Sequence, residues 1–197
     1  MNAPVNAPVP NPSEGPGWQR TLGVYLNDHL AGATGGTELV HRMVQEHGDS
    51  AYGPELRSLA TEISQDRQAL LRLMADLNVP TRRYKVYGAW LGEKLARVKP
   101  NGRLVRRSGL TVLIELETIR TGAGGKSMLW RTLLSASAED PRLDSARLEE
   151  LLRRAERQIK ALDSLHARAA SALFSPAASP RSTPAHVAGG KPSTGRG

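Results

Sequence analysis

The chain has 197 residues and a formal net charge of +8, and it contains no cysteine. This length favours one domain with flanking tails over two domains. The lack of cysteine excludes disulfide bonds, Cys-ligated zinc, iron–sulfur clusters and thiol catalysis. The N-terminus has no basic stretch followed by an apolar one, and the longest apolar run is too short to cross a bilayer. We therefore expect a cytoplasmic protein with no transmembrane segment.

Both ends of the chain are rich in proline. Residues 1–17 contain five prolines, and residues 175–197 contain four among Ala, Ser, Thr and Gly. Such segments bury too little apolar surface to offset the entropy lost on ordering. We expect both to be disordered tails around a single packed core of residues 18–174.

The first half of this core is predicted to form two helices. Apolar residues recur at spacings of three and four between about residues 18 and 47, which predicts a helix with His29 on its inward face. Gly48-Asp49-Ser50 ends this helix. Pro54, followed by Glu55, opens a second helix that stops before Pro80.

The second half begins with a long connection over residues 80–108. A short helix is predicted within it, from about residue 82 to 97, with Thr81 as its N-cap. A third long helix is expected over residues 110–135. Asp140-Pro141 is expected to cap and start a fourth helix, which ends at Ser175-Pro176. The inward face of this helix is predicted to consist of Leu148, Leu152, Ala155, Ile159, Leu162, His166, Ala169 and Leu173.

The loop lengths are short, long and short, which predicts two helical hairpins joined by a crossover. An alternating bundle with a decorated loop is the other arrangement left open. A weak repeat at an offset of 90 residues favours the hairpins, because Gly32–Val40 lies over Gly122–Trp130 and Asp66–Gln68 lies over Glu156–Gln158. This layout resembles the ferritin-like superfamily over residues 18–174. The resemblance implies an all-α, ferritin-like four-helix bundle.

The glycine-rich segments allow two interpretations. Thr121–Ser127 resembles a phosphate-binding loop, but Arg120 replaces the first glycine and no alternation of strands and helices surrounds it. We therefore interpret both segments as buried helix surfaces on which small residues let a neighbouring backbone approach closely. The residues predicted to form these packing surfaces are Gly32, Gly35, Gly36, Gly122, Gly124 and Gly125.

The resemblance also implies a metal site, built from one Glu on each of two helices and Glu-x-x-His on the other two. The chain offers Glu38–His41 and Asp163–His166. Glu38 is expected to point away from the apolar face, and the middle of two helices consists of Gly and Ala. We therefore expect a metal-free relative with no cofactor and no catalytic residue.

Each helix also places one ionisable residue on or near its inward seam. These residues are His29, Asp66, Glu117 and His166. If they are buried, each histidine needs a carboxylate partner. They are candidates for a polar network, a proton-handling site or an unconventional metal site, although only the alternating bundle would bring all four to one level.

The positive charge is concentrated in residues 82–107, which hold nine basic residues and one acidic residue. Tyr84, Tyr87 and Trp90 interleave with these cations, a pattern typical of nucleic-acid binding. A crossover helix that covers the bundle is the structural alternative, and an anionic membrane surface and an acidic protein are the other partners left open. The residues expected to face an anionic partner are Arg82, Arg83, Lys85, Arg103, Arg106 and Arg107.

These observations together predict a non-enzymatic helical interaction or scaffolding module. Its partner would be a nucleic acid or an acidic protein. Self-association into a homo-oligomer is a further prediction. Two alternatives remain. One is a ferritin-like metal-binding or redox protein that uses His29 or His166 with Asp66 and Glu117. The other is a nucleic-acid-associated stress protein.

Overall fold

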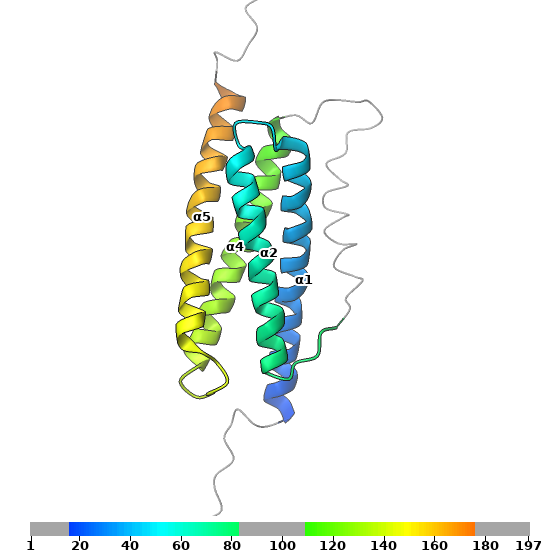
Figure 1. Ribbon diagram of the computed structural model, residues 1–197, viewed down its shortest axis with the longest axis vertical. Helices are drawn as coiled ribbons and strands as arrows, with labels where there is room; N and C mark the ends of the chain where they lie inside the picture. Colours follow the sequence, from blue (N-terminus) through cyan, green and yellow to red (C-terminus); the bar gives the residue numbers. More distant parts are fainter. Residues whose placement is uncertain (1–15, 83–108, 176–197) are drawn as a thin grey trace, which may run out of the picture.

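The computed structural model describes residues 16–82 and 109–175, which form a bundle of four α-helices (Figure 1). The described residues contain no strand, so the prediction of an all-α fold is confirmed. The helices are α1 (Pro16–His47), α2 (Gly53–Asp76), α4 (Gly109–Ala136) and α5 (Ser145–Phe174). The predicted tails and crossover helix lie outside the described residues, except at their edges, where α1 already includes Pro16 and Gly17.

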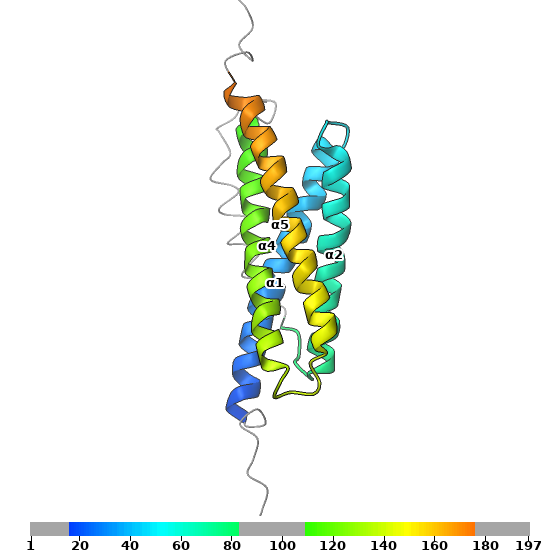
Figure 2. The same ribbon diagram turned by 90° about the vertical axis from the view of Figure 1, so that its left-hand side faces the viewer.

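The four helices form two antiparallel hairpins, α1–α2 and α4–α5 (Figures 1 and 2). Helices α2 and α4 run in the same direction, so Arg82 and Gly109 lie at opposite ends of the bundle (Figure 1). Between the hairpins, α1 packs on α4, whereas α2 and α5 approach each other closely at few positions. This connectivity confirms the prediction of two hairpins and excludes the alternating bundle.

Helix α2 ends in a hydrogen-bonded turn that returns the chain to the core. Asn78 has a φ of 55°, in the left-handed region that an Asn adopts more readily than most residues. The N–H of Val79 donates to the carbonyl of Met74 at 2.8 Å, and the N–H of Asn78 donates to that of Ala75 at 3.0 Å. This is a Schellman cap, and it buries Val79 against the helix that it ends.

The start of α5 differs from the prediction. Asp140 does not cap this helix, because its carboxylate binds Arg142 at 2.6 and 2.9 Å within the preceding turn. The N-cap is Asp144, whose side chain accepts a hydrogen bond from the N–H of Arg147 at 3.1 Å. Either Asp140 or Asp144 could act as an N-cap by residue type. Because Asp140 is used in the preceding turn, Asp144 is the residue that satisfies a free N–H group at the start of the helix.

The apolar core is divided into two clusters along the length of the bundle. One cluster surrounds Trp130 near the start of α1, and the other surrounds Leu162 near the start of α4. Between them, the buried residues of α2, α4 and α5 are polar, namely Asp66, Ser127 and Gln158. Residues 31–38 of α1, at the same level, include no buried residue.

The inward face of α5 is confirmed in part. Leu148, Ala155, Leu162 and Ala169 are buried as predicted. Beside them the buried residues are Leu151, Gln158 and Leu165, where the sequence pattern placed Leu152, Ile159 and His166. These two sets differ by one residue, about 100° around the helix, and both contain apolar residues at helical spacing. The choice between them depends on which neighbour is packed against the helix.

The glycines do not form the predicted packing surfaces. Gly32, Gly122 and Gly125 are exposed, and a Cβ atom added at any of them would meet no described atom within 4 Å. The same is true of Gly36, and at Gly124 such an atom would meet only the end of the Arg120 side chain, at 4.0 Å. The prediction of close backbone approach is therefore wrong at these five positions. The segments are nevertheless helical, which confirms that Thr121–Ser127 is not a phosphate loop.

Alanine substitutions test this correction. Because Gly122 and Gly125 lie in open positions of a helix, Gly122→Ala and Gly125→Ala should each raise the free energy of unfolding by up to about 1 kcal/mol. Urea titration followed by circular dichroism measures the change. Gly53→Ala is the matched control and should be destabilising, because its Cβ would lie 1.8 Å from the carbonyl oxygen of Gly48. Loss of stability in both test variants would restore the packing interpretation.

Candidate functional site

Asp66 on α2 is the centre of a polar layer between the two halves of the core. Its side chain is only 2% exposed. The oxygen Oδ1 accepts a hydrogen bond from Arg154 Nε at 2.6 Å, and Oδ2 accepts from Lys126 Nζ and from Gln158 Nε2, the latter at 3.1 Å. One carboxylate therefore joins α2 to both α4 and α5.

Gln158 completes the layer by using both ends of its amide. Its Oε1 accepts from Lys126 Nζ, while Nε2 donates to Asp66 and to Glu62 Oε2, the latter at 3.0 Å. The side chain is buried, so an unpaired donor or acceptor here would cost free energy. An amide meets this requirement because it combines an acceptor with two donors.

The charges of the layer balance, with Asp66 and Glu62 set against Lys126 and Arg154. Burial lowers the pKa of Lys126, while the nearby carboxylate of Asp66 opposes that shift. The oxygens of Asp66 are occupied by an ammonium and a guanidinium group. A metal ion would have to bind these same carboxylate oxygens and would be repelled by the two cations, so the residues of the layer do not fit a metal ion.

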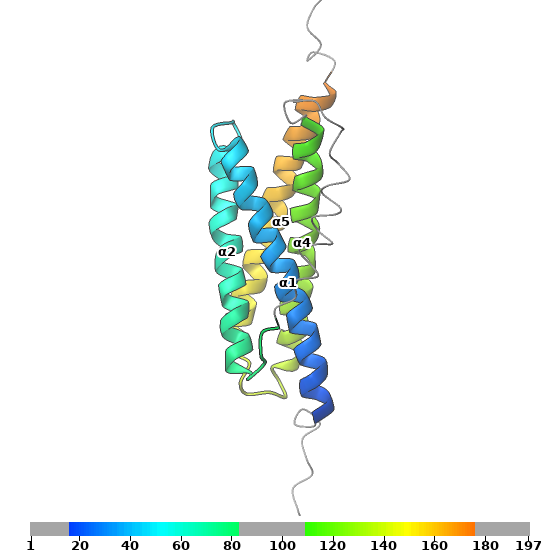
Figure 3. The ribbon, with the colours of Figure 1, turned by 90° about the vertical axis from the view of Figure 1, so that its right-hand side faces the viewer.

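The layer is also the middle of a longer series of contacts between α2 and α5. Glu55 binds Arg168 at 2.8 Å near one end of the bundle, and Asp76 lies 3.8 Å from Arg147 near the other. In each of these contacts α2 supplies the acid and α5 the base. Because α2 and α5 are antiparallel, the acids from the start to the end of α2 meet arginines from the end to the start of α5. The backbones of these two helices are apart over most of their length, and these long side chains link them (Figure 3).

Helix α1 contributes small residues at this level. Thr34 Oγ1 of α1 accepts a hydrogen bond at 3.0 Å from Nε of Arg67, the residue that follows Asp66 on α2. The glycine-rich segments of α1 and α4 both lie between the two apolar clusters.

The four ionisable residues predicted along the seam do not converge. Asp66 belongs to the layer, and His29 is half-buried with its ring edge-to-face with Tyr25, 4.7 Å between centroids. His166 binds Glu117 at 3.0 Å, but both side chains are more than a third exposed. A joint site of these four residues is excluded because the two-hairpin connectivity places them at different levels.

The two metal-like sequence motifs are also separate. Glu38 is exposed, as predicted, and His41 binds Ser64 Oγ at 3.0 Å. Asp163 forms an exposed ion pair with Arg120 at 3.0 Å. Within residues 16–82 and 109–175, no group of three or more His, Asp or Glu side chains is arranged to hold a metal ion.

The sequence pattern does not identify four members of the layer, namely Glu62, Lys126, Arg154 and Gln158. In the sequence, Lys126 stands only as the lysine of the segment that resembles a phosphate loop, and Gln158 only as part of the repeat. A usable signal was present for Lys126, because a long cation within a run of glycines has space to reach a neighbouring helix. Nothing in the helical pattern singles out Arg154 from the other arginines of α5.

Of the predicted basic surface, the structure describes only Arg82, which is exposed. Arg83, Lys85, Arg103, Arg106 and Arg107 lie outside the described residues. None of the four described helices combines the length and apolar character needed to cross a membrane. Comparison with models of protein families, with curated proteins and with solved structures finds no match, so the interpretation of the site depends on its own geometry.

Removal of the central charge tests the importance of the layer. Asp66→Asn preserves the shape but removes the carboxylate that pairs with the partly buried Lys126 and Arg154. We expect a loss of about 3–5 kcal/mol in the free energy of unfolding, measured by urea titration. Arg131→Gln is the control, because it breaks an exposed pair with Glu156 and should cost under about 1 kcal/mol. Equal losses in the two variants would show that the layer has no special role.

His29 should make stability depend on pH. Burial lowers its pKa below the ordinary value of 6.5. As pH falls through about 6.5, the unfolded chain takes up a proton before the folded chain does, so the folded state loses stability until the lowered pKa is reached. Wild type should therefore lose more stability between pH 7.5 and pH 5 than His29→Gln, in urea titrations at both pH values. Parallel losses would contradict this assignment.

Proposed function

We propose that this protein is a non-enzymatic interaction module that binds an anionic partner through the basic connection of residues 82–107. The observation that carries the proposal is the distribution of charge. The connection holds a net charge of +8, equal to that of the whole chain, so the remainder is neutral overall. Charge confined to one segment favours a surface for an anionic partner over a general effect on solubility.

The interior of the bundle supports a structural role. The middle of the bundle, where related folds place their chemistry, is filled by side chains that satisfy one another. We further propose that the chain is a ferritin-like relative in which Lys126 and Arg154 take the place of bound metal. Both cations would repel a metal ion, which disfavours the alternative of a ferritin-like redox protein.

Hydrogen bonds of Asn27 hold the chain at the first residue of the basic connection, which supports the proposal. Asn27 of α1 is buried, and its Oδ1 accepts the N–H of Arg82 at 2.7 Å. Its Nδ2 donates to the carbonyls of Pro80 at 3.1 Å and Gly23 at 2.7 Å. The amide thus ties the chain to α1 immediately before the run of cations, and Gly109 resumes the fold at the other end of the bundle.

A nucleic acid fits this charge distribution better than an acidic protein does, since aromatic residues interleave with the cations and unpaired bases stack on aromatic rings. An acidic protein remains the other outcome of the test. The proposed role is therefore that of a rigid helical support for a basic segment that binds phosphates.

Binding to heparin and to a single-stranded oligonucleotide tests this function. Retention should decrease steeply with salt, and replacing Arg103, Arg106 and Arg107 by Gln should weaken it and reduce the salt slope by up to about 2 for a single strand. The control replaces Arg72, Arg157 and Lys160, which are exposed on α2 and α5, and should have a smaller effect. No retention at low salt, or equal effects of the two triple variants, would refute the proposal. Binding to an acidic protein with none to the oligonucleotide would refute the nucleic-acid assignment.

A further inference from the structure

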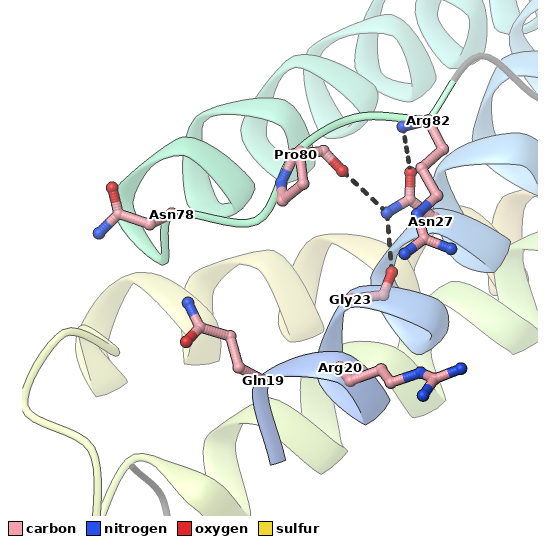
Figure 4. Close-up of a pocket in the computed structure, with 7 residues that line it drawn as sticks. All are labelled: Gln19, Arg20, Gly23, Asn27, Asn78, Pro80 and Arg82. Carbon is pink, nitrogen blue, oxygen red and sulfur yellow. Dashed lines mark hydrogen bonds between the residues drawn. The ribbon is translucent and has the colours of Figure 1, made fainter. Parts of the chain in front are cut away.

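A hollow of about 380 Å³ lies between the start of α1 and the segment that follows α2 (Figure 4). This volume falls within the range of sites for small ligands. The residues that line it are Gln19, Arg20, Gly23, Asn27, Asn78, Pro80 and Arg82. None of these seven residues is acidic, and two are arginines.

The backbone around the hollow is held in place by contacts already described. Asn27 fixes the segment from Pro80 to Arg82, and the Schellman cap at Asn78 fixes the turn before it. Gly23 contributes no side chain, and a Cβ atom there would meet only Val79 Cγ1, at 3.9 Å. The hollow therefore has a preformed wall and an open position at Gly23.

The two arginines of the hollow, unlike most described arginines of the bundle, have no partner for their guanidinium groups among the described residues. Elsewhere in the described chain, arginines such as Arg120, Arg154 and Arg168 bind carboxylates. Arg20 and Arg82 are exposed and have no hydrogen-bond or ion-pair partner for their guanidinium groups among residues 16–82 and 109–175. Of the described arginines only Arg72 and Arg157 share this condition, and neither lines the hollow.

The surroundings add further positive potential. The first turn of α1 contains Gln19 but no acidic residue, so no carboxylate of that turn offsets the positive end of the helix dipole. In Figure 4 the two arginine side chains lie at one end of the hollow, and Gln19 and Asn78 lie at the other. The arginine end offers charged donors, and the other end offers neutral amides.

We propose that this hollow binds a phosphate group carried by a larger polar molecule. Arg20 and Arg82 would hold the phosphate, since a guanidinium donates two parallel hydrogen bonds to phosphate oxygens. The amides of Gln19 and Asn78 would contact the polar part attached to it. This inference deepens the proposed function, because it gives the anionic partner a defined contact beside the first residue of the basic connection.

The phosphate has two chemical sources, a nucleic-acid strand and a free nucleotide. Calorimetric titration of the full chain with a mononucleotide, with a 5′-phosphorylated tetranucleotide and with the same tetranucleotide ending in a 5′-hydroxyl separates them. Inorganic phosphate is the smallest probe. A strand source predicts tighter binding of the phosphorylated tetranucleotide than of the mononucleotide, and a free-nucleotide source predicts the reverse.

Three variants identify the site. Arg20→Gln combined with Arg82→Gln should weaken binding of the preferred probe at least about tenfold, since each arginine contributes charge-assisted hydrogen bonds. Arg72→Gln combined with Arg157→Gln removes the same charge elsewhere and should leave binding within about twofold. Gly23→Gln should also weaken binding, because its side chain would occupy the hollow without any change in charge. Thermal melting of each variant confirms that it is folded.

The proposal is overturned if wild type shows no saturable binding of any phosphate probe, or if the two double-arginine variants lose affinity equally. Strong binding by Gly23→Gln would overturn the location. The test is separable from that of the proposed function. Replacement of Arg103, Arg106 and Arg107 should weaken retention on the polyanion while leaving inorganic phosphate bound, and loss of the hollow alone should abolish binding of inorganic phosphate while leaving the salt-dependent retention.

Discussion

The buried carboxylate of Asp66 constrains how the two hairpins of the bundle meet. Asp66 lies between two apolar clusters, where an unpaired charge would be very costly. Its oxygens therefore require donors from both helices of the other hairpin, and Lys126, Arg154 and Gln158 supply them. This requirement fixes the relative position of the hairpins along the bundle, because a shift by one helical turn would remove these partners.

The same requirement explains the unusual contact between α2 and α5. Apolar packing alone would draw two such helices together, yet few positions of their backbones come close. Acidic residues of α2 instead meet arginines of α5 at successive levels, from Glu55 with Arg168 to Asp76 with Arg147. Exposed pairs of this kind contribute little stability, so their value is in alignment, while the buried layer provides the energetic constraint.

The ionisable side chains of the polar layer balance one another, so the net positive charge of the chain comes from other residues. The cations of residues 82–107 are separated from the layer in sequence, and Asn27 holds the first of them on the side of α1. The unpaired arginines Arg20 and Arg82 lie beside this attachment point. Fixed support next to unpaired positive charge is an arrangement suited to binding phosphate.

The sequence by itself determined the four helices and their approximate ends, because periodicity and proline are local signals. Loop lengths favoured two hairpins joined by a crossover, but only the tertiary structure excluded the alternating bundle. The sequence did not determine which residues complete the inward face of α5, since Leu151 and Leu165 compete with Leu152 and Ile159 at helical spacing. It also suggested packing roles for Gly122 and Gly125, which are exposed. Only the tertiary structure decided that Lys126 reaches Asp66, because that contact joins residues 60 positions apart and depends on how two hairpins meet.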